Sequence, residues 1–426
     1  MKKIIAFLRS TYHFVLAFTG NVLFGFPSRK MFVIGITGTK GKSSTIEFLD
    51  FVLTKAGKKT AVLSSAKKKI LGSEESNSSG NTMPGRFQIQ EFLRKAVRSG
   101  AEYAIVEVTS QGVLQWRDRF INWDAGFFMN LHPEHIESHG SFENYRSAKV
   151  RFFKDVLKSK KHKKYFFVNS DDENYSYFSQ AVENNEGAEV FYFNKESFIK
   201  RAEGWGWNVK EAKDRGLISD WLLPEFNLYN SSAVLSFADV IGIPEETEKE
   251  ALREFGGLRG RFDFVQKDPF TVVVDYAHTP DSLEKIYSSL RESFLVSGRN
   301  KMICILGSAG GGRDKWKRSV MGEKAGRYCD EIILTDEDPY DEDPEEILNQ
   351  IEGGLKDYRG KVFKILDRRE AIRKALSDAK EGDVVVGTGK GSETSIHLAS
   401  GRKIPWNEKE IMRGMLMELF HSGKEA

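Results

Sequence analysis

The chain has 426 residues, enough for two or three domains at about 100–200 residues each. Hydrophobic residues make up 40% of it and charged residues 29%, a composition that excludes a mainly disordered chain. Its 64 basic and 61 acidic side chains leave a formal net charge of +3, too small to favour nucleic acid as a partner.

The two cysteines, Cys304 and Cys329, lie far apart in the sequence and outside any C-x-x-C spacing. This pattern supports neither a disulfide framework nor a zinc site. A reducing cytoplasm is the location that fits it.

Residues 1–30 form an apolar segment with a basic tip, interrupted by Arg9 and His13. The apolar stretch after His13 is shorter than the roughly 20 residues that a membrane-spanning helix needs, and no small-residue cleavage site stands out. We expect a short apolar helix that contacts a membrane surface peripherally or packs on the next domain. A secretory signal is the less favoured alternative.

Residues 31–50 read as a strand, a glycine-rich loop and a helix. Gly38 and Gly41 allow a tight turn that turns backbone N–H groups toward an anion. Lys42 supplies charge for the outer phosphates of a nucleotide, and Ser43 a hydroxyl for Mg²⁺. The spacing is G-x-x-G-x-x-G-K-S, with isoleucine where the strict P-loop has its first glycine. The strand before and the apolar helix after it favour nucleotide binding over a simple surface turn.

Strand and helix patterns alternate through the rest of the first half, which predicts a doubly wound, mostly parallel sheet. A polar loop at 67–82 reads as solvated surface or a substrate lid, and residues 204–223 as a small antiparallel excursion. The expected strands are 60–64, 103–108, 127–130, 165–169 and 189–193, and the expected helices are 87–97, 142–157, 227–241 and 245–255.

The alternation begins afresh at residue 270, after a glycine- and arginine-rich run at 256–265 that reads as a hinge. Four polar motifs, DYAHTPDS, GSAGGGRDKWKR, TDEDPYDEDP and GTGKGSE, follow strands of this second half and should meet at one sheet edge. We expect a segment at 1–30, a domain at 31–265 and a domain at 266–426. The second-half strands are 270–275, 301–306, 331–335, 362–366 and 383–387, and the helices 282–290, 316–326, 344–351 and 369–377.

Two residues near strand ends have metal-binding chemistry, Glu107 and His135. A lone carboxylate between valines is costly to bury, so Glu107 should have a cation or a hydrogen-bond partner. His132, His135 and His139 have irregular spacing that is no zinc signature. On chemistry alone, Lys149 in the helix at 142–157 reads as a solvated lysine.

The ordered motifs, from about residue 32 to near the C-terminus, resemble the Mur ligase family. The likeness is strongest to those members that add the third residue of the peptidoglycan peptide. It implies a P-loop ATPase domain followed by a Rossmann-like α/β domain, both α/β in class. The family's N-terminal domain, which holds the uridine nucleotide, has no counterpart before residue 31 of this sequence.

The resemblance also implies residue roles. Lys42, Lys149, His135 and Glu107 would be catalytic, and two Mg²⁺ ions would be held by Ser43, Glu107, His135 and Lys149, the lysine carrying a carbamate. ATP would contact Gly38, Thr39, Gly41, Lys42, Ser43, Ser44, Asn227, Asn230, Arg261, Asp275 and His278. The muramoyl-peptide acceptor and the free amino acid would contact Thr109, Arg117, Arg313, Asp338, Tyr340, Gly389 and Glu393.

The amino-acid signature D-N-P-R is altered here, with Asp338 for its asparagine and Tyr340 for its arginine, and Ser392 replaces a histidine in GKGSE. Without the bidentate guanidinium, selection of a second carboxylate is weakened. The acidic loop suits the amino group of lysine or another diamino acid.

We therefore expect a monomeric, cytoplasmic, ATP-dependent amide ligase of cell-wall biogenesis, acting through an acyl phosphate. It would add a diamino acid to a UDP-N-acetylmuramoyl-L-alanyl-D-glutamate-like acceptor and thereby serve cell shape and division. The alternatives are another ligase of the same fold, such as a folylpolyglutamate synthase or one with a different cell-wall acceptor, and a non-catalytic ATP-binding scaffold.

Overall fold

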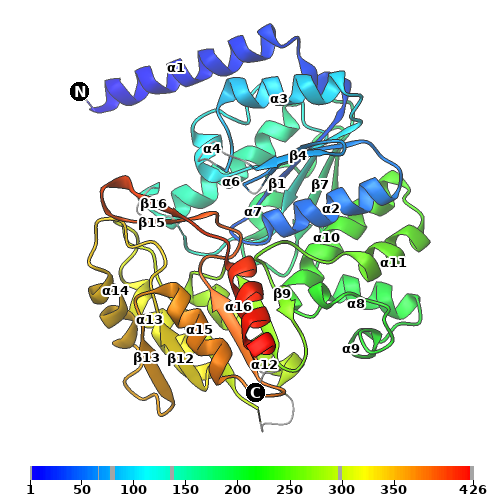
Figure 1. Ribbon diagram of the computed structural model, residues 1–426. Helices are drawn as coiled ribbons and strands as arrows, with labels where there is room; N and C mark the ends of the chain where they lie inside the picture. Colours follow the sequence, from blue (N-terminus) through cyan, green and yellow to red (C-terminus); the bar gives the residue numbers. More distant parts are fainter. Residues whose placement is uncertain (1, 66, 77–81, 135–138, 296–299, 423–426) are drawn as a thin grey trace. The chain divides into compact units, whose positions relative to one another are not determined.

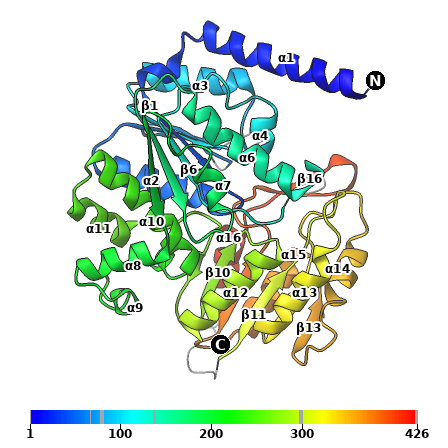
Figure 2. The same cartoon turned by 180° about the vertical axis from the view of Figure 1, so that it is seen from behind.

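The computed structural model describes residues 2–65, 67–76, 82–134, 139–295 and 300–422 (Figures 1 and 2). The chain divides into two compact units, residues 1–256 and 257–426. Each unit is built on its own sheet, which confirms the expected α/β class with a mostly parallel first sheet and a second α/β domain.

The sheet of the first unit has eight strands among the described residues, in the order β4-β3-β2-β5-β1-β6-β7-β8. Its pairs are parallel except β2 with β3 and β3 with β4. The strands are β1 (Phe32–Thr37), β2 (Thr60–Leu63), β3 (Lys67–Ile70), β4 (Ser73–Ser76), β5 (Tyr103–Glu107), β6 (Ala125–Phe128), β7 (Lys164–Asn169) and β8 (Ala188–Phe193).

Helices cover both faces of this sheet because its strands are apolar on both sides. Val33 and Phe166 face the cluster under α3 and α6, while Phe127 and Phe167 pack on Phe237 of α10, on the side of α2. The helices are α1 (Lys2–Leu23), η1 (Pro27–Lys30), α2 (Lys42–Lys55), α3 (Arg86–Arg98), α4 (Ser110–Leu114), α6 (Phe142–Leu157), α7 (Tyr175–Ser179), α8 (Lys195–Gly204), α9 (Val209–Ala212), η2 (Asp220–Leu222), α10 (Glu225–Ile241) and α11 (Glu245–Glu254).

The second unit has a six-stranded sheet among its described residues, in the order β13-β12-β11-β14-β10-β9, with β9 antiparallel. Helices α15 and α16 pack on one face through Ile372, Met412 and Leu416. The strands of this sheet are β9 (Asp263–Gln266), β10 (Thr271–Asp275), β11 (Met302–Leu306), β12 (Glu331–Leu334), β13 (Lys361–Lys364) and β14 (Val384–Thr388). A separate antiparallel pair is formed by β15 (Ser395–His397) and β16 (Lys403–Pro405). The helices are α12 (Pro280–Phe294), α13 (Lys317–Tyr328), α14 (Pro344–Glu352), α15 (Arg368–Asp378), η3 (Ala399–Gly401) and α16 (Glu408–Ser422).

Two expectations about local structure were wrong. The polar stretch at 67–82 contains the antiparallel hairpin β3–β4, because Lys67 and Lys69 are neutralised by Glu47 and Asp50 of α2. The antiparallel excursion expected at 204–223 is instead the end of α8 with α9 and η2. Trp221 anchors that segment by packing against aromatic rings of the first unit.

A third correction concerns the cysteines. Cys304 on β11 and Cys329 after α13 form a disulfide, with their Cα atoms 6.0 Å apart. The strand and helix between them bring Cys329 back beside Cys304. Their separation in the sequence gives no sign of this proximity.

The segment at 1–30 contains a helix, as expected. α1 packs on α3, where the rings of Phe24 and Phe87 meet edge to face. Among the residues described, no helix is long and apolar enough to cross a membrane.

Candidate functional site

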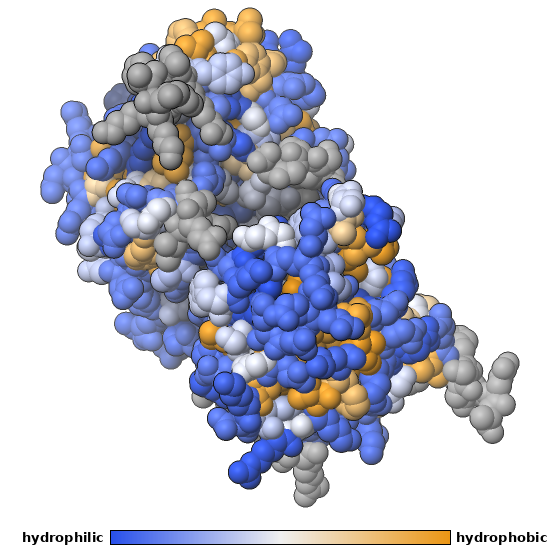
Figure 3. Space-filling model, turned by 90° about the vertical axis from the view of Figure 1, so that its left-hand side faces the viewer, coloured by the Kyte–Doolittle hydropathy of each residue, from blue (hydrophilic) through white to orange (hydrophobic). Residues whose placement is uncertain are grey.

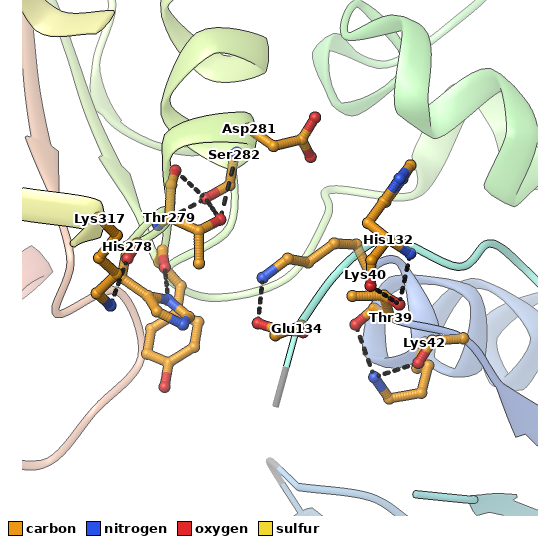
Figure 4. Close-up of polar contacts among 12 residues, drawn as sticks. Thr39, Lys40, Lys42, His132, Glu134, His278, Thr279, Asp281, Ser282 and Lys317 are labelled. Atoms are coloured by element: carbon orange, nitrogen blue, oxygen red, sulfur yellow. Dashed lines mark hydrogen bonds and ion pairs between the residues drawn. The ribbon is translucent and has the colours of Figure 1, made fainter. Parts of the chain in front are cut away.

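The loop between β1 and α2 is held in shape by its own lysine. Lys42 Nζ donates to the carbonyl oxygens of Gly38 and Thr39, at 3.0 Å each (Figure 4). Gly41 has φ of +80°, and a Cβ there would lie 2.6 Å from Asn230 Oδ1, so only glycine fits. The N-terminus of α2 then faces the loop, an arrangement that binds phosphate.

Glu107 ends β5, beside β1, and is buried. Its Oε2 accepts from the backbone N–H of Ser65 at 2.8 Å and from Ser43 Oγ at 3.5 Å, and its Oε1 lies 3.9 Å from Lys42 Nζ. The carboxylate therefore has the hydrogen-bond donor and the cation that burial demands. Ser65 was missed in the sequence, because a lone serine after a strand carries no signal.

Lys149 is not a solvated side chain: it is 2% exposed on α6. Its Nζ donates to the Gly38 carbonyl at 2.8 Å. Burial, and then the charge of Lys42, hold the pKa of the Lys149 amine well below its ordinary value, which favours the neutral form. Lys149, Lys42 and Glu107 thus converge on the loop.

Serine hydroxyl and carboxylate oxygens are ligands that Mg²⁺ prefers, so Ser43 and Glu107 fit this ion. Among the described residues no three or more His, Cys, Asp or Glu side chains gather as a metal cluster. His135, the further predicted ligand, lies outside the described residues.

Asn227 and Asn230 of α10 brace the same loop. Asn230 Oδ1 accepts from Thr45 Oγ1 of α2 at 3.1 Å, and its Nδ2 donates to Asn227 Oδ1 at 2.8 Å. Asn227 Nδ2 donates in turn to the Trp221 carbonyl at 2.6 Å. Ser44, also predicted to contact nucleotide, is buried on the first turn of α2.

Four residues in or around the same loop were not predicted from the sequence: Lys40, Asn130, Glu134 and Tyr145. Lys40 Nζ pairs with Glu134 at 2.9 Å (Figure 4). The backbone N–H of Lys40 donates to Asn130 Oδ1 at 2.8 Å. Thr39 Oγ1 lies 3.1 Å from the Tyr145 hydroxyl and accepts from the His132 N–H at 3.0 Å. Tyr145 was hidden in a helix pattern that predicts its burial but not its partner.

Thr109 and Arg117 flank α4, just after Glu107. Thr109 caps the helix by accepting from the Gly112 N–H at 3.0 Å. Arg117 donates to the Met83 carbonyl and to Gln115 Oε1. Thr109 and Arg117, which the sequence predicts to contact the muramoyl-peptide substrate, therefore also form hydrogen bonds within the first unit.

In the second unit, Asp275 ends β10 and accepts from the backbone N–H groups of Phe262 and Ala277, both at 2.7 Å. The Arg261 guanidinium lies over the Tyr276 ring, 4.8 Å from its centre. His278 Nδ1 donates to the Tyr276 carbonyl at 2.7 Å, at the start of α12 (Figure 4).

The polar motifs of the second unit meet at one edge of its sheet, as expected. Asp338 Oδ1 accepts from Lys390 Nζ at 2.8 Å, and Lys390 Nζ also pairs with Glu393 at 2.6 Å. Glu393 Oε1 accepts from the Tyr276 hydroxyl at 3.2 Å, which ties in the DYAHTPDS motif. Lys390, fully buried, was not predicted to lie in the site.

Tyr340 stacks on the His397 ring, with centres 5.2 Å apart and planes 15° apart. Arg313 Nη2 donates to the Tyr340 hydroxyl at 3.4 Å, and its guanidinium lies 5.7 Å from the ring centre. Tyr340 has φ of +52°, a strained conformation for a bulky residue.

Glu337, like Lys390, lies at this edge of the sheet but was not predicted from the sequence to belong to the site. It is 5% exposed, and its Oε2 has no hydrogen-bond partner among the described residues. Burial raises the pKa of Glu337 to about 7. Gly389 has φ of +98°, and a Cβ there would lie 2.5 Å from Glu337 Oε2, so glycine leaves the room that this carboxyl occupies.

Two family models match the chain: one described as Mur ligase middle domain over residues 36–238, and one described as Mur ligase, glutamate ligase domain, over residues 260–391. The UDP-N-acetylmuramoyl-L-alanyl-D-glutamate--2,6-diaminopimelate ligase of Caldanaerobacter subterraneus subsp. tengcongensis is 35% identical over 400 residues, which cover 92% of this chain and 79% of that protein. The UDP-N-acetylmuramyl-tripeptide synthetase of Roseiflexus sp. is 34% identical over 433 residues, covering 96% and 83%.

Solved structures are also similar to this chain. A structure of a UDP-N-acetylmuramoyl-L-alanyl-D-glutamate--2,6-diaminopimelate ligase matches with a TM-score of 0.61 at 25% identity, over 92% of this chain and 79% of that one. The Mycobacterium tuberculosis folylpolyglutamate synthase complexed with ADP matches with a TM-score of 0.66 at 16% identity, over 91% and 94%. The latter likeness shows the shared fold alone.

Proposed function

The chain belongs to the Mur ligase family, and on that premise we propose that it attaches a diamino acid to a UDP-N-acetylmuramoyl-L-alanyl-D-glutamate-like acceptor in peptidoglycan synthesis. As a member, it is an ATP-dependent ligase whose fold uses ATP and Mg²⁺. The observation that carries the proposal is the convergence of Lys42, Glu107 and Lys149 on one phosphate-binding loop.

A carboxylate is a poor electrophile, so it must first be activated. The acceptor carboxylate attacks the γ-phosphorus of ATP, giving an acyl phosphate and ADP, and the amino group of the amino acid then displaces phosphate. Lys42 neutralises charge on the transferring phosphoryl group, which is how such sites supply most of their catalysis. Exclusion of water protects the acyl phosphate from hydrolysis.

Mg²⁺, when bound, adds positive charge at the phosphates and orients them. We assign its ligands to Ser43 and Glu107, and those of a second ion to His135 and to a carbamate on Lys149. A carbamate forms when a neutral amine adds CO₂ and loses a proton. The lowered pKa of Lys149 supports this assignment, because it favours the reactive neutral amine.

The amino acid would bind at the edge that holds Asp338, Tyr340, Gly389 and Glu393, with Arg313 beside them. This edge is acidic, and Glu337 adds a buried carboxyl whose Oε2 has no hydrogen-bond partner in the part of the chain that the structure describes. Both features favour a side-chain amino group, as in lysine, over the second carboxylate of diaminopimelate. Thr109 and Arg117 would position the muramoyl peptide.

We assign the phosphate loop of the ATP site to residues 31–265, and the amino-acid step together with the ATP contacts Asp275 and His278 to residues 266–426, within a monomer. The ATP contacts would be the loop residues with Asn227, Asn230, Arg261, Asp275 and His278. Residues 1–30 would contact a membrane peripherally.

The test is phosphate release with Mg²⁺-ATP, the UDP-linked muramoyl dipeptide and a panel of L-lysine, meso-diaminopimelate and L-ornithine. We expect release that requires both the acceptor and one amino acid, and its loss in Lys149→Ala. Protein that binds ATP yet releases no phosphate across the panel would contradict the proposal and favour a scaffold.

A further inference from the structure

An open surface depression of about 330 Å³, called the cavity below, lies on the first unit and is lined by Arg29, Asn122, Lys160 and Lys161. Arg29 precedes β1, Asn122 precedes β6, and the two lysines precede β7. The cavity is therefore at the amino ends of parallel strands, whereas the phosphate loop and Glu107 are at their carboxyl ends. The candidate active site does not account for it.

One of the three cations around this cavity has a carboxylate partner among the described residues, and two do not. Lys161 Nζ is neutralised, because it pairs with Asp124 at 2.9 Å and donates to the Met31 carbonyl at 2.7 Å. Arg29 and Lys160 form no ion pair with a carboxylate among the described residues. The exposed Arg29 guanidinium lies over the Phe26 ring, 4.3 Å from its centre.

The cavity also contains a neutral polar group in a fixed position. Asn122 accepts from the Lys160 N–H through Oδ1 at 3.2 Å, and its backbone N–H donates to Ser28 Oγ at 2.9 Å. Asn122 Nδ2 also donates to Ser28 Oγ, at 3.4 Å, so the exposed Arg29 guanidinium and Lys160 ammonium are the donors here that suit a phosphate group.

Helix α1, which precedes Arg29 in the chain, has an exposed apolar side. Phe14 and Phe18 pack partly on Phe120, and the side chains beside them are open to solvent. In the view of Figure 3, hydrophobic side chains are visible at the top of the molecule, at the height of α1 in Figure 1, and also lower down. The exposed fractions are 60% for Tyr12, 50% for Val15, 47% for Phe18, 44% for Val22 and 72% for Leu23.

We propose that the side of α1 formed by Tyr12, Val15, Phe18, Val22 and Leu23 docks on an anionic lipid bilayer, with a lipid phosphate seated between Arg29 and Lys160. The inference rests on the proposed membrane contact of residues 1–30 and adds a headgroup site to it. Arg29 and Lys160, which have no carboxylate partner among the described residues, suit the acidic headgroups of a bilayer. The exposed apolar side of α1 suits its acyl chains.

The test is sedimentation of the full chain with vesicles of phosphatidylcholine alone or mixed with phosphatidylglycerol. A basic side chain near an anionic surface contributes roughly fivefold in affinity, so Arg29→Gln/Lys160→Gln should bind the mixed vesicles about 30-fold more weakly. Arg29→Lys/Lys160→Arg, which keeps both charges, should bind like the native protein. Thermal unfolding checks that all variants are folded.

The matched control is Lys356→Gln/Arg359→Gln, which removes the same two charges from exposed positions of the second unit. Equal weakening in this control, or unchanged binding by the cavity variant, would overturn the proposal. So would saturable binding of inorganic phosphate, abolished by the cavity variant, in a protein that ignores vesicles.

Phosphate release with soluble substrates separates this inference from the proposed ligase activity. The cavity variant should keep native turnover because its residues lie away from the phosphate loop. Vesicle binding without turnover in the native protein would refute the ligase proposal alone.

Discussion

In the first unit, Lys42 and Lys149 donate to backbone carbonyls of residues 38 and 39, whereas in the second unit Lys390 and Arg368 donate to buried carboxylates. The lowered pKa of Lys149 favours its neutral form, so Lys42 is the charged member of the first pair, and its Nζ also lies 3.9 Å from Glu107 Oε1. In the second unit Lys390 and Arg368 are already neutralised by these carboxylates, and Glu337 Oε2 is one of several buried polar atoms without a hydrogen-bond partner among the described residues. These contacts support the proposal that the first edge binds phosphate and the second an amine.

If the paired cations of the second unit are structural, breaking a pair should unfold it. Arg368 donates to both carboxylate oxygens of Glu408, which also accepts from Trp406 Nε1 at 2.6 Å, and the pair is fully buried. Glu408→Ala would leave a buried guanidinium uncompensated, at a cost of about 3–5 kcal/mol in the free energy of unfolding. Urea unfolding measures it.

The control is Glu418→Ala, which removes the exposed partner of Arg373 and should cost less than about 1 kcal/mol. Equal losses in the two variants would show that the buried pair has no special role.

In the first unit, removing a lysine should instead affect catalysis. Lys42→Met deletes the charge proposed to act on the transferring phosphoryl group, so kcat should fall about 100- to 1000-fold, and the loss of the cation beside buried Glu107 should also lower stability. Phosphate release and thermal unfolding measure the two effects. Lys55→Met, at the far end of α2 and paired with Glu250 and Glu254, should leave kcat unchanged. A kcat lost equally in both would contradict the assignment.

The sequence predicted this loop well because its glycines, lysine and serine are consecutive and local. Lys149 is different, since its role depends on which side of α6 faces the loop. Ala148, Phe152, Phe153 and Val156 form the apolar stripe of that helix, and Lys149 lies on it, so the periodicity did contain a signal of burial.

Other errors came from contacts between distant segments. The hairpin β3–β4 has no apolar alternation, because its lysines are stabilised by carboxylates on α2 rather than by a core. The pairing of Cys304 with Cys329 likewise depends on a strand-helix unit closing on itself. Glu337 reads as one acid among many in TDEDPYDEDP, and only burial distinguishes it.

The unpartnered Glu337 gives the second unit a pH dependence. Burial raises its pKa from the ordinary 4.5 to about 7 in the folded state, so the folded chain binds the proton more tightly than the unfolded one. Stability should therefore fall as pH rises through that window, by about 1–3 kcal/mol. Glu337→Gln cannot ionise, so the difference in unfolding free energy between it and the native protein should grow from pH 5 to about pH 8. A constant difference would show that Glu337 ionises normally.

The smallest expected effect tests the amine preference of the second edge directly. Tyr340→Arg restores a guanidinium where the family signature has one, and a charge-assisted bidentate contact to a second carboxylate should raise kcat/KM for meso-diaminopimelate relative to L-lysine about tenfold. The gain is limited because the new side chain inherits φ of +52° and replaces the stacking on His397. Tyr340→Phe keeps that stacking and loses only the hydroxyl that accepts from Arg313, so it should leave the ratio unchanged. A ratio shifted equally by both variants would mean that the aromatic packing, rather than the missing cation, sets which amino acid this edge accepts.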